Sequence, residues 1–471
     1  MILDNLVGED RWTHSRHAER ILLIGGESGI PVGSGVGFPT YGRAENNLRV
    51  LVTGVEGFIG RHLVAALGAA GHTVVAGVRR PTNPDAIACD FSRDIVPDAW
   101  IPRLAGIDVV INAVGILRES GANTFERVHI SSPKALFEAC HRLGVQRVIQ
   151  ISALGSPAAG EYLVSKLRGD VELAHLELDW TIVRPSLVYS IRGSYGGTSL
   201  LRAMAALPGV LFVPGSGDQL MQPIRAEDLA AVVVALVDKK AGIREVISAV
   251  GPERVTLLTY LLETRRWLEL PAPVVVRVPE VIARFGAWLG EHVSNGPVGM
   301  TMWRMLNLGN VATDESTREM VTISGVAPLS LEQALDAAPS FVQDRWHARL
   351  YFLGPLLRVA LAILWIGSGL VGFLTPMTSS QELFASAGLP PAVAAPSVFA
   401  AGTVDLVLGI LALIAWRPAL VAGLMCTSLL VYTLFIGVVF PSLWLEPFGG
   451  LLKNLPLFPA VLVMGVLSRG L

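Results

Sequence analysis

Short apolar runs alternate with longer amphipathic stretches over residues 48–188. The runs at residues 73–78, 109–113, 147–151 and 180–183 are rich in β-branched side chains, which indicates buried strands. Stretches with apolar residues at helical spacing lie between them, near residues 131–143 and 162–178. This rhythm predicts an α/β fold, a doubly wound parallel sheet with helices on both faces and ligands at the carboxyl ends of the strands.

The pattern is weaker on either side of this region. Residues 1–47 are polar and then rich in glycine, which predicts a poorly ordered tail. Residues 189–338 are less regular, and helices near residues 256–268 and 279–292 predict a small substrate lobe. The aromatic residues of this lobe have two interpretations, helix-core packing or the lining of an apolar pocket, and core packing is the commoner case. They are Trp267, Phe285, Trp288 and Trp303.

From residue 351 to residue 471 the chain is almost free of charge. Four apolar runs lie at residues 352–374, 398–416, 420–440 and 451–467, and each is near the ~20 residues that cross a bilayer. Buried helices of a soluble domain are the alternative, but four such runs in succession favour a four-helix transmembrane bundle. Arginines flank one side of the bundle, at positions 345, 349, 417 and 469, whereas the opposite loops carry Glu382 and Glu446. The positive-inside rule then places the α/β domain and the C-terminus in the cytoplasm, on the cell (inner) membrane.

Three ionisable residues fall inside the apolar runs. Asp405 is near the middle of the second run, Arg358 lies within the first, and Lys453 opens the fourth. Charges at such depth are costly unless they are paired or face a cavity. Long side chains such as those of Arg358 and Lys453 can instead reach the membrane surface. We expect Asp405 to face the bundle interior, to pair with Arg358, and to border a site for a lipophilic redox partner such as a quinone.

Composition narrows the function classes. With 471 residues, the chain is too long for one core, so two or three domains are expected. The mean hydropathy of +0.53 exceeds that of ordinary soluble proteins. A formal charge of -2 argues against nucleic acid as the main partner. The 3 cysteines lie far apart and no metal-binding spacing occurs, so we expect neither a disulfide framework nor a metal.

Three glycines follow the first strand in the spacing G-x-x-G-x-x-G. Gly54 allows a tight turn, Gly57 lets a phosphate approach the backbone, and Gly60 lets the following helix pack closely on the strand. The N–H groups and dipole at the start of this helix suit a pyrophosphate. The spacing alone also fits an ordinary glycine-rich turn, but a strand before it and a helix after it favour a dinucleotide site.

Polar residues stand at the carboxyl ends of the next strands. Arg79 and Arg80 occupy the place where NAD sites usually carry a carboxylate, and two arginines suit a 2′-phosphate, so NADP(H) is favoured over NAD(H). A solvated basic turn is the alternative. Asp90 and Phe91 could hydrogen-bond to and flank an adenine, or the two residues could form a simple surface turn. Small residues at 112–115 leave room for a cofactor, or simply end the strand.

The fifth strand and the helix after it carry the candidate chemistry. Tyr162 and Lys166 lie four residues apart, on one face of a helix, so the ammonium can approach the phenol and lower its pKa. Ser152, at the preceding strand end, can hold a substrate oxygen. These groups predict a hydride-transfer site, with Tyr162 as general acid/base, Lys166 as its pKa modifier and ribose ligand, and Ser152 as the polarising hydroxyl. A random Y-x-x-x-K pair is common, but here it follows a glycine loop in the right order.

From residue 48 to residue 338 the chain resembles the short-chain dehydrogenase/reductase superfamily, in its extended or atypical branch. The glycine spacing, Asn112-Ala113-x-Gly115, Ser152, Tyr162-x-x-x-Lys166 and the segment 184–189 carry the resemblance. Within that branch, Arg79 and the segment 148–155 are most similar to proteins related to the 39-kDa accessory subunit of respiratory complex I. The resemblance implies a Rossmann fold that binds NAD(P). The expected cofactor-binding residues are Gly54, Glu56, Gly57, Phe58, Ile59, Gly60, Arg79, Arg80, Asp90, Phe91, Ala113, Val114, Gly115, Tyr162, Lys166 and Pro185.

The region from residue 351 resembles the DoxX-like membrane family, with Arg417-Pro418 between the second and third helices and Lys453-Asn454 at the start of the fourth. Together the two resemblances imply a membrane-anchored NAD(P)-dependent oxidoreductase for a carbonyl/alcohol or quinone-type substrate. Some members of the branch hold the nucleotide structurally, so the alternative is a non-catalytic NAD(P)H-binding assembly or sensor subunit. The expected partners are membrane lipid, a quinone or other lipophilic substrate, and another membrane protein.

Overall fold

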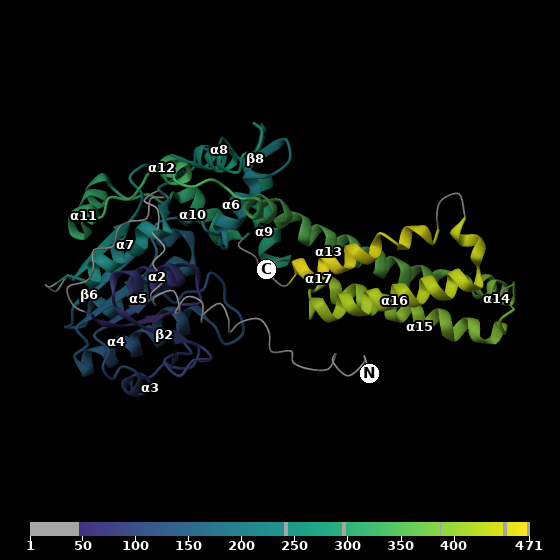
Figure 1. Ribbon diagram of the computed structural model, residues 1–471, viewed down its shortest axis with the longest axis horizontal. Helices are drawn as coiled ribbons and strands as arrows, with labels where there is room; N and C mark the ends of the chain where they lie inside the picture. Colours follow the sequence, from purple (N-terminus) through teal and green to yellow (C-terminus); the bar gives the residue numbers. More distant parts are fainter. Residues whose placement is uncertain (1–46, 240–243, 294–297, 387, 446–449, 469–471) are drawn as a thin grey trace, which may run out of the picture. The chain divides into compact units, whose positions relative to one another are not determined.

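The computed structural model describes residues 47–239, 244–293, 298–386, 388–445 and 450–468 (Figure 1). The chain forms two compact units, which meet in sequence between Arg345 and Trp346 and are called unit 1 and unit 2 below. The predictions for residues 1–46, Glu446 and Arg469 lie outside the described residues.

Unit 1 is built on a seven-stranded sheet in the order β11-β6-β5-β4-β1-β2-β3. Every neighbouring pair in this sheet is parallel, which confirms the predicted doubly wound parallel sheet. The order reverses between β1 and β4, so the carboxyl ends of these two strands border the crevice where such sheets bind ligands. The strands are β1 (Arg49–Thr53), β2 (Thr73–Val78), β3 (Ile87–Ala88), β4 (Val109–Asn112), β5 (Arg147–Ile151), β6 (Trp180–Pro185) and β11 (Glu245–Ala249).

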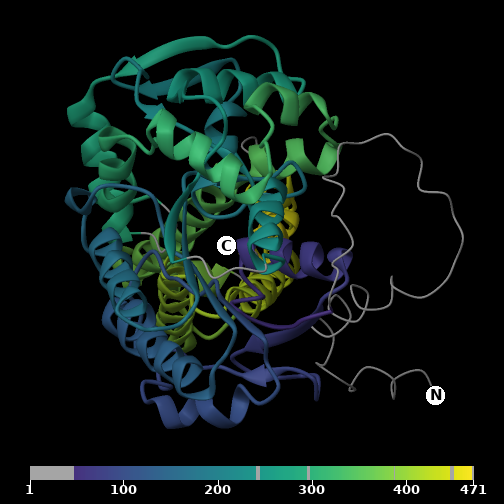
Figure 2. The ribbon, with the colours of Figure 1, turned by 90° about the vertical axis from the view of Figure 1, so that its left-hand side faces the viewer.

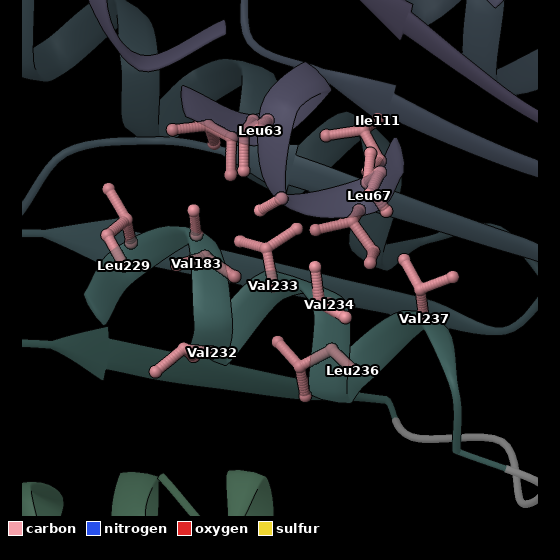
Figure 3. Packing of buried hydrophobic residues seen from close by; sticks show 14 of the residues in the cluster. Leu63, Leu67, Ile111, Val183, Leu229, Val232, Val233, Val234, Leu236 and Val237 are labelled. Atoms are coloured by element: carbon pink, nitrogen blue, oxygen red, sulfur yellow. The ribbon is translucent and has the colours of Figure 1, made fainter. Parts of the chain in front are cut away.

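Helices cover both faces of this sheet (Figure 2). On one face α2 (Phe58–Ala70) packs against α7 (Ala226–Val237), and on the other α4 (Ser132–Leu143) packs against α5 (Glu161–Ala174). In Figure 3, Leu63 and Leu67 of α2 face the valines of α7. Because α7 is apolar on almost every side, burial rather than intrinsic helix propensity holds its many valines in a helix.

A smaller lobe follows β6 along the chain. The helices expected near residues 256–268 and 279–292 are α8 (Leu257–Trp267) and α9 (Glu280–Val293). Trp267 is buried and donates a hydrogen bond from its indole N–H to the carbonyl oxygen of Ala338. The other helices of unit 1 are α3 (Pro97–Trp100), α6 (Gly197–Ala205), α10 (Met300–Leu308), α11 (Asp314–Ser324) and α12 (Leu331–Asp336). The short strand pairs are β7 (Val188–Tyr189) with β10 (Ile224–Arg225), β9 (Leu220–Met221) with β12 (Val255–Thr256), and β8 (Val210–Pro214) with β13 (Val274–Val278).

The core-packing interpretation of the lobe's aromatic residues is wrong for Phe285 and Trp288. These two residues are 60% and 47% exposed, so they do not pack in a core. They belong to α9, whose bulky apolar face points outward. A helical pattern in the sequence shows that a helix has an apolar face, but it does not show what that face contacts.

Three helices of the described chain are long and apolar enough to cross a membrane, with mean hydropathies of 2.0, 1.8 and 2.2. They contain α13 (Val342–Leu374), α15 (Ala394–Leu413) and α16 (Pro418–Val439). The short helix α14 (Met377–Ser386) lies between the first two in sequence. The fourth apolar run forms a shorter apolar helix, Leu452–Leu467, in which α17 (Leu457–Leu467) has 11 residues and begins after Pro456. A fourth span therefore stays a prediction.

Close packing and buried hydroxyl groups hold unit 2 together. A Cβ on Gly369 of α13 would lie 2.6 Å from the carbonyl oxygen of Gly402 on α15, a spacing that only small residues allow. Asp405 is buried, as expected, but its carboxylate accepts a hydrogen bond of 2.8 Å from the Ser368 hydroxyl, while the Tyr432 hydroxyl donates to the carbonyl oxygen of Ala401 at 3.4 Å. The expected partner was Arg358. It lies ten residues before Ser368 on α13, about 15 Å along the helix axis, so the predicted pairing is wrong.

Candidate active site

The turn after β1 forms a cradle that only glycine permits. Gly54 has φ of +74°, and a Cβ there would lie 2.9 Å from the carbonyl oxygen of Ala113, after β4. A Cβ on Gly60 would lie 2.1 Å from the Gly54 carbonyl oxygen, so α2 packs directly on the turn. Gly57 caps α2 without a side-chain hydrogen bond, and the first N–H groups of the helix keep their capacity to bind an anion. This cradle fits the pyrophosphate of a dinucleotide.

The other predicted residues of the glycine loop contribute mainly through the backbone. Glu56 is exposed, and its carbonyl oxygen accepts a hydrogen bond from Arg61. The ring of Phe58 meets His62 edge to face at 5.3 Å between centroids. Ile59 packs against the core under α2. The N–H groups of Phe58 and Ile59 lie in the first turn of α2, where they suit a phosphate group.

Arg79 and Arg80 follow β2 and are both exposed. The Arg79 guanidinium donates to the Asn123 side chain at 3.1 Å and lies 4.0 Å from the Asp90 carboxylate. Burial alone would raise the pKa of Asp90, but the Ser92 hydroxyl and N–H, aided by two nearby arginines, hold that pKa below its usual value. Asp90 is thus an ionised group beside Arg79.

Phe91 takes a different position from the one predicted. Its side chain is buried in the core and meets Trp100 edge to face, with 5.4 Å between ring centroids. It is therefore not available to flank an adenine, because the core encloses the ring. The sequence could not separate these outcomes, since an aromatic residue after a strand end suits both a core and a ligand site.

Lys166 connects the carboxyl ends of two sheet strands. Its ammonium donates to the carbonyl oxygen of Ile151 at 2.9 Å, at the end of β5, and to that of Val114 at 3.3 Å, just after β4. Burial lowers the pKa of Lys166 to about 8, against the opposing effect of Asp170. Gly115 keeps this place open, because a Cβ there would lie 3.4 Å from the ammonium nitrogen. The structure thus brings Lys166 to the ligand-binding edge of the sheet.

Tyr162 lies one helical turn before Lys166 on α5. Its ring meets the ring of His129 at 5.8 Å and that of Phe125 at 6.4 Å, both edge to face. Burial raises the pKa of Tyr162 to about 12. The expected lowering by Lys166 does not appear, because the Lys166 ammonium donates its hydrogen bonds to backbone carbonyl groups. In this structure the phenol therefore holds its proton at neutral pH.

Ser152 is also placed differently from its predicted role. It is buried at the end of β5, and its hydroxyl donates a 2.9 Å hydrogen bond to the Asp170 carboxylate on α5. Arg184 of β6 donates to the same carboxylate oxygen at 3.0 Å and 2.9 Å. Burial raises the pKa of Asp170, although Ser152, Arg184 and Lys166 all oppose the shift. With its proton directed to Asp170, Ser152 positions its neighbours rather than polarising a substrate oxygen.

Two residues of this site were missed from the sequence, Asp170 and His129. Asp170 lies four residues after Lys166 on the same helix face, a spacing that could have identified it. His129 is buried, accepts a 3.0 Å hydrogen bond from the Ile116 N–H, and lies 2.8 Å from the Ser165 hydroxyl. Burial and Lys166 lower the pKa of His129 to about 2, so its ring is neutral. It lies in a π-helical segment (Glu126–Ser131) that no residue pattern predicted.

The remaining predicted residues lie at the same edge of the sheet. Ala113 borders the Gly54 turn. The carbonyl oxygen of Pro185, the last residue of β6, accepts a hydrogen bond from the Leu154 N–H at 2.9 Å, which fixes the chain between β5 and α5. Strand ends, a glycine cradle and a tyrosine–lysine pair thus lie at one edge of the sheet. Such an edge can bind a dinucleotide and present a phenol to a second ligand.

Comparison with known proteins assigns both parts of the chain. Residues 50–249 match the NAD dependent epimerase/dehydratase family, and residues 362–462 match the DoxX-like family. An epimerase family protein from Mycobacterium bovis is 30% identical over 273 residues, covering 53% of this chain and 89% of that protein. The chain belongs to the NAD dependent epimerase/dehydratase family. This member carries a DoxX-like region with helices apolar enough to cross a membrane, in agreement with both resemblances drawn from the sequence.

Two other relatives of this epimerase/dehydratase family member have named activities or assemblies. The ceramide reductase of Caulobacter vibrioides is 32% identical over 193 residues, covering 40% of this chain and 60% of that protein. The mitochondrial NADH dehydrogenase [ubiquinone] 1 alpha subcomplex subunit 9 of Arabidopsis thaliana is 26% identical over 261 residues, covering 50% of this chain and 63% of that protein. The matched segment is thus less than two thirds of either relative.

Among solved structures, the UDP-glucuronic acid 4-epimerase from Bacillus cereus, in complex with UDP-glucuronic acid and NAD, has a TM-score of 0.46 and 21% sequence identity. It covers 64% of this chain and 100% of its own.

Proposed function

We propose that this protein is a membrane-anchored NAD(P)-dependent oxidoreductase of the short-chain dehydrogenase/reductase type that reduces a lipophilic carbonyl compound or a quinone. The observation that carries the proposal is the position of the Tyr162–Lys166 pair. Lys166 is fixed to the ends of β4 and β5, beside the glycine cradle, and Tyr162 stands one helical turn away. A family member with this pair, this cradle and a DoxX-like region has the parts that a membrane reductase needs.

In the proposed reaction the cofactor and the residues of the chain have different roles. A bound reduced nicotinamide supplies a hydride to the carbonyl carbon of the substrate. Tyr162 donates the phenolic proton to the carbonyl oxygen, so an alcohol forms and solvent reprotonates the phenolate. The phenol of Tyr162 is protonated before the reaction, as a proton donor must be, although burial makes it a weaker acid. Lys166, beside the glycine cradle, would bind the ribose, while Asp170, through Ser152, holds the end of β5 in place.

The cofactor preference proposed is NADP(H). Arg79 and Arg80 follow β2 and are exposed at the place where a 2′-phosphate lies in this fold. The guanidinium of Arg79 is hydrogen-bonded to Asn123 and lies 4.0 Å from the Asp90 carboxylate, which holds this exposed side chain near the nucleotide edge. Arginine forms paired hydrogen bonds with phosphate oxygens, so this arrangement supports the phosphorylated cofactor.

The proposed location is the cell (inner) membrane, with unit 1 in the cytoplasm. The positive flanks of unit 2 support this orientation, because Arg345, Arg349 and Arg417 lie on the same side of a two-span hairpin. The reduced nucleotide is also available there. The ceramide reductase relative supports a lipid-like substrate, since the name describes reduction of a lipid.

A deuteride-transfer experiment tests this function. The full-length protein, purified in detergent, receives NADPH deuterated at the nicotinamide C4 together with long-chain ketones, long-chain aldehydes or short-chain quinones. We expect NADPH consumption with at least one lipophilic acceptor, and deuterium on the carbinol carbon of the product when the acceptor is a carbonyl compound. Tight NADPH binding without consumption by any acceptor would contradict the proposal.

A non-catalytic NAD(P)H-binding subunit is the second candidate function, and one observation favours it. The Ser152 hydroxyl donates its hydrogen bond to Asp170, so the serine that usually assists a hydride-transfer site is engaged elsewhere. The complex I subunit relative from Arabidopsis thaliana, whose name describes a subunit, agrees with this candidate. Nucleotide that co-purifies with the protein and does not exchange with added NADPH would support it.

A further inference from the structure

Helix α9 (Glu280–Val293) presents its bulky apolar side to solvent. Five of its residues are between 45% and 79% exposed, and their spacing places them on one side of the helix. We call this side the α9 face; it consists of Val281, Ile282, Phe285, Trp288 and Leu289. Soluble proteins scatter single exposed apolar residues, but a contiguous set of this kind marks an interaction site.

The opposite side of α9 is made of small residues. Ala287 is buried, and a Cβ on Gly290 would lie 2.5 Å from the Val298 side chain. The helix therefore packs on the lobe through alanine and glycine, with no room there for its large residues. A simple rotation cannot bury the α9 face, because Phe285 and Trp288 would then meet the contact that Gly290 keeps open.

Hydrogen bonds hold α9 against two segments that lead to the candidate active site. Arg118, in the segment after β4 that also carries Val114, donates hydrogen bonds to the carbonyl oxygens of Glu291 and Val298. The Glu291 carboxylate accepts from the Met300 N–H at 3.2 Å, which joins α9 to α10. On α10, Met305 packs against the same small cluster as Tyr162, which consists of Ala153, Ala159 and Leu163. The α9 face thus belongs to the same group of elements as the catalytic pair.

A lipid surface is the occupant that the chain itself suggests. Phe and Trp on an amphipathic helix suit the boundary between headgroups and acyl chains, and the exposed Arg284 on the same helix suits anionic headgroups. The first helix long enough to cross a membrane begins at Val342, 49 residues after the last residue of α9. Because that helix tethers unit 1 to a bilayer, the effective lipid concentration at the α9 face is high.

We propose that the α9 face inserts into the lipid interface of the membrane in which unit 2 is anchored. Insertion places unit 1 on the bilayer rather than free in solution. A lipophilic substrate can then pass from the membrane towards Tyr162 without crossing water. This last consequence rests on the proposed function, whereas insertion itself does not.

Lipid-borne quenching tests the insertion directly. In a Cys426→Ser background, Phe285→Cys is labelled with an NBD fluorophore, and the full chain is reconstituted in vesicles of phosphatidylcholine and phosphatidylglycerol with 5-doxyl phosphatidylcholine. The other two cysteines, Cys89 and Cys140, are buried. Glu315→Cys on α11, also at an exposed position, is the matched control. We expect the nitroxide lipid to quench the label at 285 at least twofold more than the label at 315.

Two outcomes would overturn the proposal. Equal quenching at the two positions, with the label at 285 open to aqueous iodide, would show that the face stays in water. A label at 285 shielded from both quenchers would show that protein covers it, such as a second copy of the chain. Trp288→Cys repeats the measurement if Phe285→Cys does not fold. The readout involves no turnover, so its failure leaves the proposed function to be judged separately.

Discussion

Each unit of the chain contains a buried helical aspartate that accepts a hydrogen bond from a serine, Asp170 in unit 1 and Asp405 in unit 2, but the two carboxylates have different partners. In unit 1, Asp170 accepts hydrogen bonds from Ser152 and from the guanidinium of Arg184. In unit 2, Asp405 accepts a hydrogen bond from the hydroxyl group of Ser368. Unit 1 therefore balances its buried charge with a cation, whereas unit 2 gives its acid a neutral donor.

The difference teaches how the two surroundings set the role of an acid. A charged pair costs desolvation energy and repays it only with good geometry, which Arg184 and Ser152 supply near the solvated edge of the sheet. Between helices of a membrane unit the cost is greater, and hydroxyl donors satisfy a carboxyl group without adding a second charge. The contribution of Asp170 to stability thus depends on its charge, whereas that of Asp405 depends on its hydrogen bond.

The largest expected effect comes from Asp170→Ala. It leaves the half-buried Arg184 and the buried Ser152 without their acceptor, and we expect a loss of about 3–5 kcal/mol of unfolding free energy. The measurement is denaturant unfolding of the purified protein in detergent. The matched control is Glu172→Ala on the same helix, whose ion pair with Lys134 is solvent-exposed and is expected to matter by less than about 1 kcal/mol. Equal losses for the two variants would refute the comparison.

The corresponding change in unit 2 separates charge from hydrogen bonding. Asp405→Leu leaves the hydroxyl group of Ser368 without its acceptor, and we expect a loss of about 1–3 kcal/mol. Asp405→Asn keeps an acceptor oxygen in the same place, so its stability should be close to that of the parent. Thermal unfolding in detergent compares the two variants. An Asn variant as unstable as the Leu variant would show that unit 2 also needs the charge.

The active-site cation of unit 1 should appear in a pH profile. The pKa of Lys166, about 8 in the folded protein, lies below the ordinary value of 10.5, so the folded state loses this proton first. Between these two values the unfolded chain binds more protons, and this group's contribution to stability rises with pH. Nucleotide affinity should move the other way and fall above pH 8, by up to about tenfold per pH unit. Isothermal titration with NADPH checks this; a flat parent profile to pH 9.5 would contradict it.

The smallest expected effect concerns cofactor choice at an exposed position. Arg79→Asp should weaken NADPH binding about five- to tenfold, because the 2′-phosphate then meets a carboxylate, and should leave NADH binding unchanged or slightly tighter. Arg93→Asp, at an arginine that is even more exposed, is the control. If titration shows that Arg79→Asp binds both nucleotides as the parent does, the preference for NADP(H) is wrong.

Much of unit 1 could be predicted from the sequence, because the glycine spacing and the strand rhythm each reflect a strict physical requirement. Gly54 has a positive φ, and Gly60 lies so close to the turn that a Cβ would be 2.1 Å from the Gly54 carbonyl oxygen. Few other folds require both features at that spacing. The position of Lys166 followed from its place one helical turn after Tyr162. These inferences concern the backbone and local spacing, which a sequence records directly.

The partners of buried polar groups could not be predicted in the same way. Ser152 and Asp405 were assigned to a substrate oxygen and to Arg358, but in the structure their partners are Asp170 and Ser368. Hydrogen bonds between distant segments depend on how helices are rotated and spaced, and local patterns do not encode this. The outward α9 face was missed for the same reason, since periodicity identifies a face without its neighbour.

One comparison tests the central claim most directly, the rate of NADPH consumption by Tyr162→Phe beside that of the parent. Phenylalanine keeps the ring contacts with His129 and Phe125, so folding and NADPH affinity should change little. It removes the proton donor, and we expect consumption with the best lipophilic acceptor to fall at least about 100-fold. A Tyr162→Phe variant that binds and consumes NADPH as fast as the parent would contradict the assignment of Tyr162 as the catalytic acid.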